Sequence, residues 1–353
     1  MHKITINCEK LNHPNTGLYH YCANLSKALL AATPANYSLQ VYAPASAAAM
    51  YPPGTIIIPQ HGWHKLFNPN NYNCNLWHAT NQEKSYFPIA QSVKKILTVH
   101  DLNYFNDPSK PLHKRTRYLR NIKSLVRRSS HLICISAYTL RELQKHMAIN
   151  LPHSIIYNGC NIDFAVPETK PALHLQAPFI FTIGTITDKK NFHVLPALLV
   201  GNRYLLVIAG DIHRLDYQQK IIATAKQLGV ADRVVFTGGI TEGEKLWYYR
   251  NCLAFAFPSL HEGFGLPVVE AMAFGKPLFL STHTSLPEVG GPDAFYFEHF
   301  DPAYMNRLFT EKLNYFNANK MVLKQNLLNR AATFSWAEAA RQHWEIYTRV
   351  LNS

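Results

Sequence analysis

Short, continuously apolar runs alternate with longer segments of helical periodicity along the whole chain. Such runs are typical of strands that are buried on both faces of a parallel sheet, because an exposed face would require polar residues at alternate positions. Two successive series of strands and helices predict an α/β fold with two doubly wound parallel-sheet domains. The predicted strands are residues 3–8, 39–42, 56–59, 76–78, 95–99, 131–135 and 154–157 in the first series and 179–184, 204–209, 233–237, 253–258, 277–280 and 294–297 in the second.

The boundary between the two domains is expected within residues 158–178, where an Asn-Gly pair and three prolines occur without periodicity. We therefore assign residues 1–163 to the first domain and 164–335 to the second. The remaining residues, about 336–353, have apolar side chains spaced for one face of a helix. Ligands of open parallel sheets bind outside the carboxyl ends of the strands, so functional residues are expected in the loops that follow strands.

Composition excludes several other classes of protein. Hydrophobic residues make up 47% of the 353 residues, which excludes a disordered chain. Every long apolar run is interrupted, so we expect no membrane-spanning helix. The six cysteines include no C-x-x-C pair, and the first residues lack the apolar core of a signal peptide. We therefore expect reduced thiols and a cytoplasmic protein.

Positive charge is concentrated in the first half of the chain. Residues 1–160 contain 17 Lys and Arg and 5 Asp and Glu, whereas residues 161–353 contain 18 and 17. Basic residues recur every three or four positions in the expected helix 112–128, which predicts a stripe that includes Arg117, Arg120 and Lys123. Such a stripe suits an anionic membrane surface or a phosphorylated, lipid-linked acceptor; a solvated helix face is the alternative. Nucleic acid is not expected as a partner, because the chain has no reader motif.

The segment PSLHEGFGLPVVEAMAFGKP, which follows a predicted strand, contains the strongest functional signal. Its two carboxylates, Glu262 and Glu270, are spaced as E-x7-E. Gly263 and Gly265 allow the backbone to approach a ligand closely. The helix expected to begin near Leu266 offers N–H groups and the positive end of its dipole to an anion. Carboxylates in such a loop are suited to bind the hydroxyls of a sugar or a ribose, and an ordinary surface helix is the alternative.

This segment, together with others along the chain, resembles the signature of the retaining glycosyltransferases of family 4. The resemblance covers most of the chain and implies the GT-B fold, in which two Rossmann-like domains face a cleft. The second domain then binds a nucleotide-sugar donor and the first an acceptor. In this fold a C-terminal helix such as 336–353 often packs back on the first domain. The other matching motifs are NTGLYHY, VHDL, ISAYT, YNG, FTIGTITDKKN, VIAG and STHTSLPEVGG, in that order.

The resemblance also implies roles for residues of the second domain. Glu262 would contact the hydroxyls of the donor sugar, and Glu270 would hold the ribose of the nucleotide. Lys190 would neutralise the diphosphate leaving group, since a fixed ammonium stabilises developing negative charge without a metal ion. The alternative for Lys190 is a solvated lysine beside Lys189. Donor contacts from the surrounding loops would involve Gly184, Thr185, Gly263, Phe264, Gly265 and Leu266.

Thr185 departs from the family pattern, because many members have an arginine at this position. One phosphate contact is therefore lost, and Lys190 with the helix end would carry more of the charge. In the first domain, His100 of VHDL matches a family histidine that faces the donor sugar, and Gly17 lies in a loop that closes over the diphosphate. A structural histidine and an ordinary turn glycine are the alternatives. Retaining members have no established side-chain nucleophile, so the resemblance implies front-face substitution.

The motifs most resemble those of bacterial mannosyltransferases that extend the O-antigen chain of lipopolysaccharide. They imply a retaining hexosyltransferase at the cytoplasmic face of the inner membrane, with GDP-mannose as the expected donor and a lipid-linked or polysaccharide acceptor. No metal ion or other cofactor is expected, because the chain has no D-x-D or H-E-x-x-H motif. The alternatives are a nucleotide-sugar epimerase on the same fold and a non-catalytic protein that binds a membrane or nucleic acid.

Overall fold

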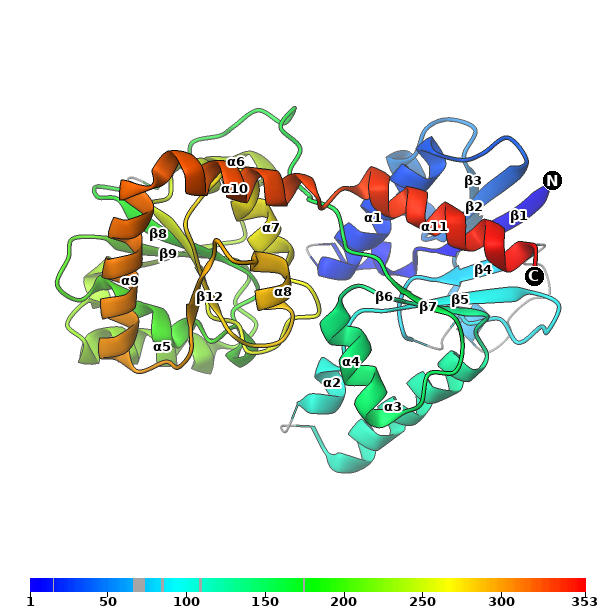
Figure 1. Cartoon of the computed structure of the whole chain (residues 1–353), viewed down its shortest axis with the longest axis horizontal. Helices are drawn as coiled ribbons and strands as arrows, with labels where there is room; N and C mark the ends of the chain where they lie inside the picture. The colour runs from blue at the N-terminus through cyan, green and yellow to red at the C-terminus, as the bar shows by residue number, and fades with distance from the viewer. Residues whose placement is uncertain (15, 66–73, 84–85, 108–109, 174) are drawn as a thin grey trace. The chain divides into compact units, whose positions relative to one another are not determined.

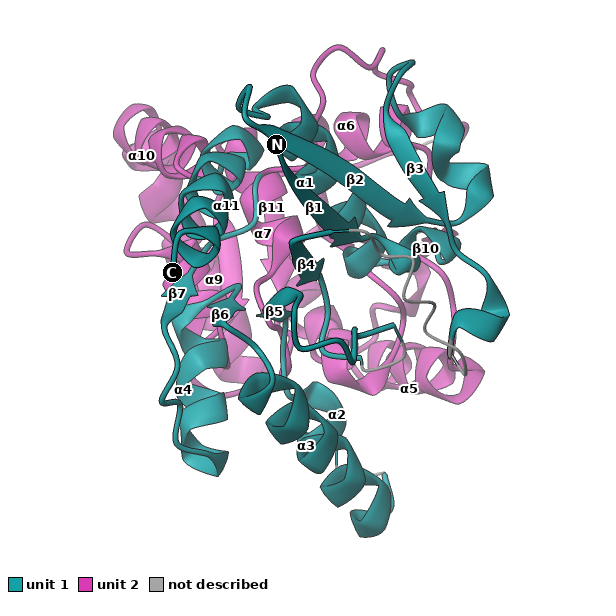
Figure 2. Cartoon of the chain, turned by 90° about the vertical axis from the view of Figure 1, so that its right-hand side faces the viewer, with its two compact units in different colours: residues 1–159, 334–353 teal, residues 160–333 magenta. Residues whose placement is uncertain are grey.

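The chain folds into two compact units, each with its own parallel sheet (Figures 1 and 2). Unit 1 comprises Met1–Gly159 and Phe334–Ser353, and unit 2 comprises Cys160–Thr333. Asn15 of the NTGLYHY motif lies outside the described residues. The computed structural model describes residues 1–14, 16–65, 74–83, 86–107, 110–173 and 175–353.

Unit 1 contains a seven-stranded parallel sheet in the order β3-β2-β1-β4-β5-β6-β7. The order reverses between β1 and β4, so a crevice is expected where these two strands end. The strands are β1 (His2–Asn7), β2 (Tyr37–Ala43), β3 (Ile56–Pro59), β4 (Leu76–Ala79), β5 (Lys94–Val99), β6 (His131–Cys134) and β7 (His153–Ile155). The helices are η1 (Glu9–Asn12), α1 (Gly17–Ala31), η2 (Ala45–Met50), η3 (Gly62–Lys65), α2 (Asn103–Asn106), α3 (Leu112–Arg127), α4 (Ala137–His146) and α11 (Trp336–Leu351).

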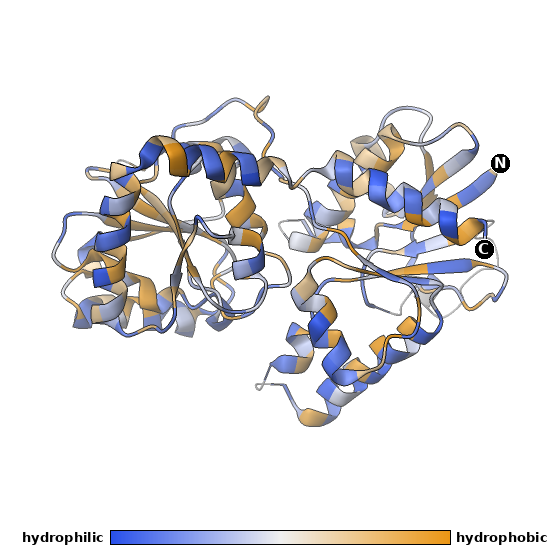
Figure 3. Ribbon diagram, in the orientation of Figure 1, coloured by the Kyte–Doolittle hydropathy of each residue, from blue (hydrophilic) through white to orange (hydrophobic). Residues whose placement is uncertain are grey.

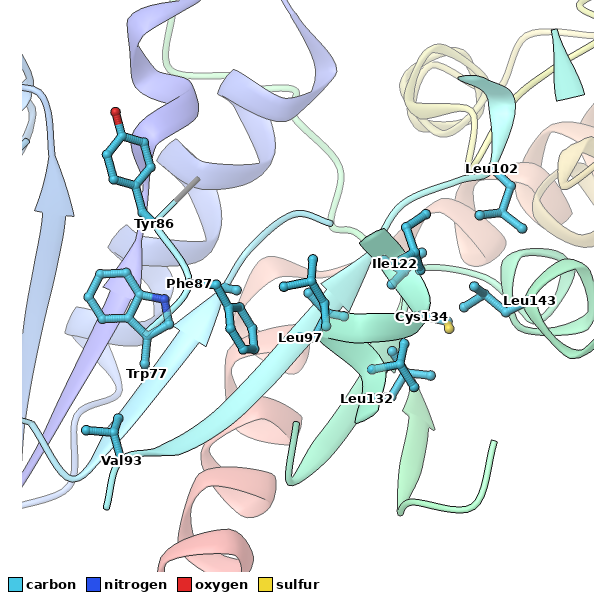
Figure 4. Packing of buried hydrophobic residues seen from close by; sticks show 14 of the residues in the cluster. Trp77, Tyr86, Phe87, Val93, Leu97, Leu102, Ile122, Leu132, Cys134 and Leu143 are labelled. Atoms are coloured by element: carbon cyan, nitrogen blue, oxygen red, sulfur yellow. The ribbon is translucent and has the colours of Figure 1, made fainter. Parts of the chain in front are cut away.

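The apolar strands of unit 1 build its core. Trp77 of β4, Leu97 of β5 and Leu132 of β6 are fully buried, and Ile122 of α3 packs in the same cluster (Figure 4). Burial of each such side chain contributes about 1.5–3 kcal/mol, which is why strands with an apolar residue at every position are covered on both faces. Figure 3 shows the helices, in contrast, with both hydrophilic and hydrophobic residues.

The C-terminal helix α11 belongs to unit 1, where it packs against α1. The indole Nε1 of Trp344 donates to the carbonyl of Leu29 at 3.1 Å. The Tyr347 hydroxyl lies 2.6 Å from Nδ1 of His78 on β4. The side chains of α11 therefore reach the sheet as well as the neighbouring helix.

Unit 2 contains a six-stranded parallel sheet in the order β10-β9-β8-β11-β12-β13. Numbered within the unit, this is the Rossmann order 3-2-1-4-5-6, and its reversal lies between β8 and β11. The strands are β8 (Phe179–Ile183), β9 (Leu205–Ala209), β10 (Val234–Gly238), β11 (Ala254–Phe257), β12 (Leu278–Ser281) and β13 (Phe295–Phe297). The helices are η4 (Asp188–Lys190), η5 (Phe192–Leu199), α5 (Leu215–Gln227), η6 (Ala231–Arg233), α6 (Glu242–Asn251), α7 (Leu266–Ala273), α8 (Leu286–Gly290), α9 (Pro302–Ala318) and α10 (Lys320–Ala332).

The predicted α/β fold is confirmed, because every predicted strand is present and both sheets are entirely parallel. The basic helix α3 occurs where it was predicted and buries Ile122, Leu125 and Val126. Tyr118 and Leu119, which the spacing assigned to the same buried face, are only half-buried. Within the described part of the chain, no helix is long and apolar enough to span a membrane.

Candidate functional site

The strongest candidate site lies where the strand order of unit 2 reverses. β8 is followed by Gly184, Thr185 and the short helix η4, which ends at Lys190. The neighbouring strand β11 is followed by the loop that contains Glu262. Parallel strands end at the same edge of the sheet, so these two loops meet at the position where doubly wound sheets bind ligands.

Lys190 and Glu262 form an ion pair across the two loops. Nζ of Lys190 lies 2.5 Å from Oε1 of Glu262, and the two side chains are 11% and 14% exposed. The same ammonium lies 4.8 Å from the ring centroid of Phe257, the last residue of β11. This enclosure excludes the interpretation of Lys190 as a solvated surface lysine, whereas its neighbour Lys189 is exposed. Less water surrounds these two charged groups than surrounds charges on the open surface. Each of them therefore interacts more strongly with a charged ligand than an exposed side chain would.

The loop that carries Glu262 is fixed by hydrogen bonds from hydroxyl groups. The Ser259 hydroxyl donates to Oε1 of Glu262 at 2.7 Å. The backbone N–H of Glu262 donates to Oγ1 of Thr284 at 3.1 Å, and the Ser285 hydroxyl donates to the carbonyls of Glu262 and Phe264. Ser259 therefore orients the carboxylate, and residues of the STHTSLPEVGG segment, which begins at the last residue of β12, hold the backbone of the loop.

Two glycines of the site are required by the backbone geometry. Gly265 has a φ of 105°, and a Cβ there would lie 2.9 Å from Cδ2 of Leu286. Gly184 has a φ of 147°, and its Cβ would lie 3.3 Å from Cε of Lys190. Other residues rarely adopt such φ angles, so glycine at Gly184 allows the lysine to lie across the end of β8.

Gly265 is also the N-cap of α7, whose first turn exposes N–H groups without intrahelical partners. Gly263, Phe264 and Gly265 are buried, and Leu266 is half-buried as the first residue of the helix. The positive end of the α7 dipole and the Lys190 ammonium are thus contributed by loops that follow adjacent strands. Together they can bind an anion such as a diphosphate.

Glu270, in the second turn of α7, is 6% exposed and bonded within unit 2. The Tyr249 hydroxyl donates to its Oε2 at 2.9 Å, and Nζ of Lys245 lies 3.7 Å from its Oε1. Burial, with the nearby charge of Glu270, raises the pKa of Tyr249 well above its ordinary value, so the phenol remains a donor. Burial opposes the charge of Lys245, but the carboxylates of Glu270 and Glu242 raise its pKa overall.

In unit 1, His100 follows β5 and is 7% exposed. Its Nε2 lies 2.7 Å from the carbonyl of Thr80, which accepts, so the proton is on Nε2. The ring packs edge-on against Tyr21 at 4.6 Å. Burial lowers the pKa of His100 to about 4, so the imidazole is neutral near pH 7. No bond to Nδ1 is found among the described residues, and this nitrogen can accept a hydrogen bond from a ligand hydroxyl.

The other candidate residues of unit 1 lie elsewhere. Gly17 begins α1 after the N-cap Thr16, and a Cβ there would meet no atom within 4 Å. Packing within unit 1 therefore does not explain a glycine at this position. On α3, Arg117 and Arg120 are exposed, and the half-buried Lys123 lines a pocket with Met147.

Comparison with known proteins identifies the larger part of unit 2. Residues 168–315 match the family model described as "Glycosyl transferases group 1". This part of the chain is a glycosyl transferases group 1 domain. The match includes Lys190, Glu262 and Glu270, and it confirms the family resemblance of their motifs.

Relatives of the glycosyltransferase domain include enzymes named as mannosyltransferases. The chain is 30% identical over 284 residues to the serotype-specific mannosyltransferase WbdA of Escherichia coli, a match that covers 74% of the chain and 34% of WbdA. It is 29% identical over 206 residues to the O-antigen chain mannosyltransferase RfbU of Salmonella typhimurium, covering 57% of the chain and 55% of RfbU. The chain thus spans about one third of the length of WbdA and about half of RfbU.

Solved glycosyltransferase structures share the fold of the whole chain. A sucrose-phosphate synthase from Thermosynechococcus elongatus superposes with a TM-score of 0.77 at 18% identity, and the match covers 100% of both chains. At this identity the likeness shows the fold alone, which is the expected GT-B fold with two Rossmann-like domains.

Sequence reasoning missed several residues of the glycosyltransferase domain. Ser259, Tyr249 and Lys245 contact the two carboxylates. Ser259 lies in the PSLHEGFG segment, but a serine three residues before a glutamate does not by itself indicate this contact, and the other two residues lie outside the motifs. The pairing of Lys190 with Glu262 was also missed. A usable signal was present, because both residues follow strands that are adjacent in a Rossmann order.

Proposed function

We propose that the chain is a retaining glycosyltransferase that transfers a hexose from a nucleotide sugar to a lipid-linked or polysaccharide acceptor. The observation that carries this proposal is the enclosed Lys190–Glu262 pair beside the N-terminus of α7. It combines a carboxylate that accepts from sugar hydroxyls with two sources of positive charge for a departing diphosphate. The match covers only 34% of WbdA, so its name supports the proposal without establishing it.

In this mechanism the pair is a resting arrangement that the donor replaces. The diphosphate attracts Lys190, and Glu262 accepts from hydroxyls of the sugar while Ser259 keeps its carboxylate in place. Glu270 holds the ribose, with Tyr249 fixing the orientation of its carboxylate. In unit 1, the neutral His100 can accept a hydrogen bond from a ligand hydroxyl through Nδ1. The leaving phosphate takes the proton of the acceptor hydroxyl, so neither a metal ion nor a covalent intermediate is used.

Mannose from GDP-mannose is the proposed donor sugar, because the names of WbdA and RfbU specify mannosyl transfer. The proposed acceptor is an O-antigen or related lipopolysaccharide chain at the cytoplasmic face of the inner membrane. The exposed cations of α3 support this location, since an anionic leaflet attracts a basic helix.

Turnover of donors tests the proposal. Wild type and Glu262→Gln are incubated with GDP-mannose, UDP-glucose, UDP-GlcNAc, dTDP-rhamnose or GDP-fucose, in the presence of EDTA. We expect hydrolysis or transfer of one donor by wild type, with retained anomeric configuration, and at least a hundredfold loss in Glu262→Gln. Glu311→Gln, which changes an exposed glutamate, is the matched control. Release of an epimerised free sugar would identify an epimerase. If wild type neither turns over any donor nor binds any nucleotide, both the glycosyltransferase and the epimerase proposals are rejected.

A further inference from the structure

Trp63 is an exposed aromatic residue four positions after the carboxyl end of β3. It lies in η3 and is 55% exposed, more than any of the other four tryptophans. Its indole stacks on His61, with ring centroids 6.1 Å apart at 14°, and meets His64 edge-on at 4.2 Å. His64 is buried, and its Nδ1 lies 2.8 Å from the hydroxyl of Tyr42. The buried His64 thus supports the edge of the indole, although Trp63 as a whole is more than half exposed.

Polar side chains continue along the same edge of the sheet from Trp63. Gln60, the residue after β3, accepts from Asn12 at 3.0 Å and donates to the Tyr86 hydroxyl at 2.8 Å. Beyond β1, Glu9 accepts from Asn81, which follows β4, at 3.1 Å.

At the β5 end of this edge, Gln82 accepts from the backbone N–H of His100 at 3.1 Å. We call the residues along this edge the carboxyl-edge strip. They are Asn12, Gln60, Trp63, Asn81, Gln82 and His100.

The strip is too long for a single sugar. Trp63 follows β3 and His100 follows β5, which are four strand spacings apart in the sheet order. With neighbouring strands about 4.8 Å apart, the two residues are separated by about 19 Å along the edge. A ligand that contacts both ends must therefore be an extended chain.

We propose that Trp63 is a remote acceptor subsite, which binds a hexose residue of an oligosaccharide several sugars from the reacting end. The C–H face of a pyranose can pack on an indole, and its hydroxyls match the amides of Gln60 and Asn12. This inference rests on the proposed function, because it assumes that transfer occurs beside His100.

The test compares acceptor lengths. Wild type, Trp63→Ala and Trp63→Phe are assayed with manno-oligosaccharides and malto-oligosaccharides of one to five units. We expect the kcat/KM advantage of the four-unit acceptor over the two-unit acceptor to fall about tenfold in Trp63→Ala and to persist largely in Trp63→Phe. Donor hydrolysis without acceptor should not change. Ile89→Ala, which removes another exposed apolar side chain, is the matched control.

Binding is measured separately from turnover. Longer oligosaccharides should protect wild-type tryptophan fluorescence from acrylamide quenching, and the protection should be absent in Trp63→Ala. The subsite would be overturned if Trp63→Ala kept the wild-type dependence on acceptor length and if neither manno- nor malto-oligosaccharides protected wild-type fluorescence from acrylamide. Loss of binding to anionic vesicles in Trp63→Ala, with unchanged length dependence, would identify a membrane contact instead. Failure of wild type to use any donor would reject the proposed function, while the quenching result would still decide whether Trp63 binds oligosaccharides.

Discussion

At the scale of single residues, Lys190 and Lys189 are adjacent lysines with different surroundings. Lys190 is enclosed and paired with Glu262, whereas Lys189 is exposed. If Lys190 stabilises the leaving diphosphate, Lys190→Ala should lower kcat about 10²–10³-fold and raise the KM for the donor much less, because the charge develops in the transition state. Steady-state kinetics with the donor identified in the turnover panel measures this difference.

Lys189→Ala is the matched control and should retain activity close to wild type. The carboxylate of Glu262 keeps its bond from Ser259 in Lys190→Ala, so we expect the variant to fold, which circular dichroism can verify. Equal losses in the two variants, or full turnover by Lys190→Ala, would remove Lys190 from the proposed leaving-group role.

At the scale of elements, α3 presents cations that lack carboxylate partners within the described part of the chain. Each basic residue near an anionic leaflet contributes about 1 kcal/mol to binding. Reversal of Arg117, Arg120 and Lys123 to Glu should therefore weaken binding to vesicles that contain anionic lipid by at least a hundredfold. Co-sedimentation with phosphatidylglycerol vesicles measures the effect, and added salt should weaken wild-type binding in the same direction.

The control for this variant reverses Lys220, Lys226 and Lys320, which are exposed on helices of unit 2. It changes the net charge equally, so a similar loss would show a general charge effect rather than a surface on α3. Unchanged binding of the α3 variant would leave its stripe as a solvated helix face.

At the scale of the whole molecule, the strands could be predicted because each is a local apolar run. The site could be predicted only in part. Glu262 and Glu270 lie in one recognisable segment, but the partner of Glu262 is 72 residues away. His78 and Tyr347 are 269 residues apart in the sequence. The contact of His78 with Tyr347 depends on how α11 packs in unit 1, and a histidine in a strand does not by itself indicate a buried hydrogen bond.

These buried histidines make the stability of unit 1 depend on pH. His343 of α11 is 1% exposed; its Nδ1 donates to the carbonyl of Ala339 at 2.7 Å, and its Nε2 has no partner among the described residues. The ring of His78 lies 5.3 Å away, and Tyr347 contacts both histidines. Burial lowers the pKa of His343 to about 4 and that of His78 well below its ordinary value. Both side chains are therefore neutral in the folded unit.

As the pH falls, these histidines are protonated in the unfolded chain near pH 6.5, whereas in the folded chain they are protonated only at lower pH. The free energy of unfolding of unit 1 should therefore decrease as the pH falls from about 6.5 to about 4, with a slope of up to about 1.4 kcal/mol per pH unit for each histidine. Trp247→Phe removes the tryptophan of unit 2, so fluorescence in urea then reports on unit 1. In this background, His343→Leu should flatten the slope, whereas His113→Gln, which changes an exposed histidine, should not. An unchanged slope in His343→Leu would show that other groups cause the acid sensitivity.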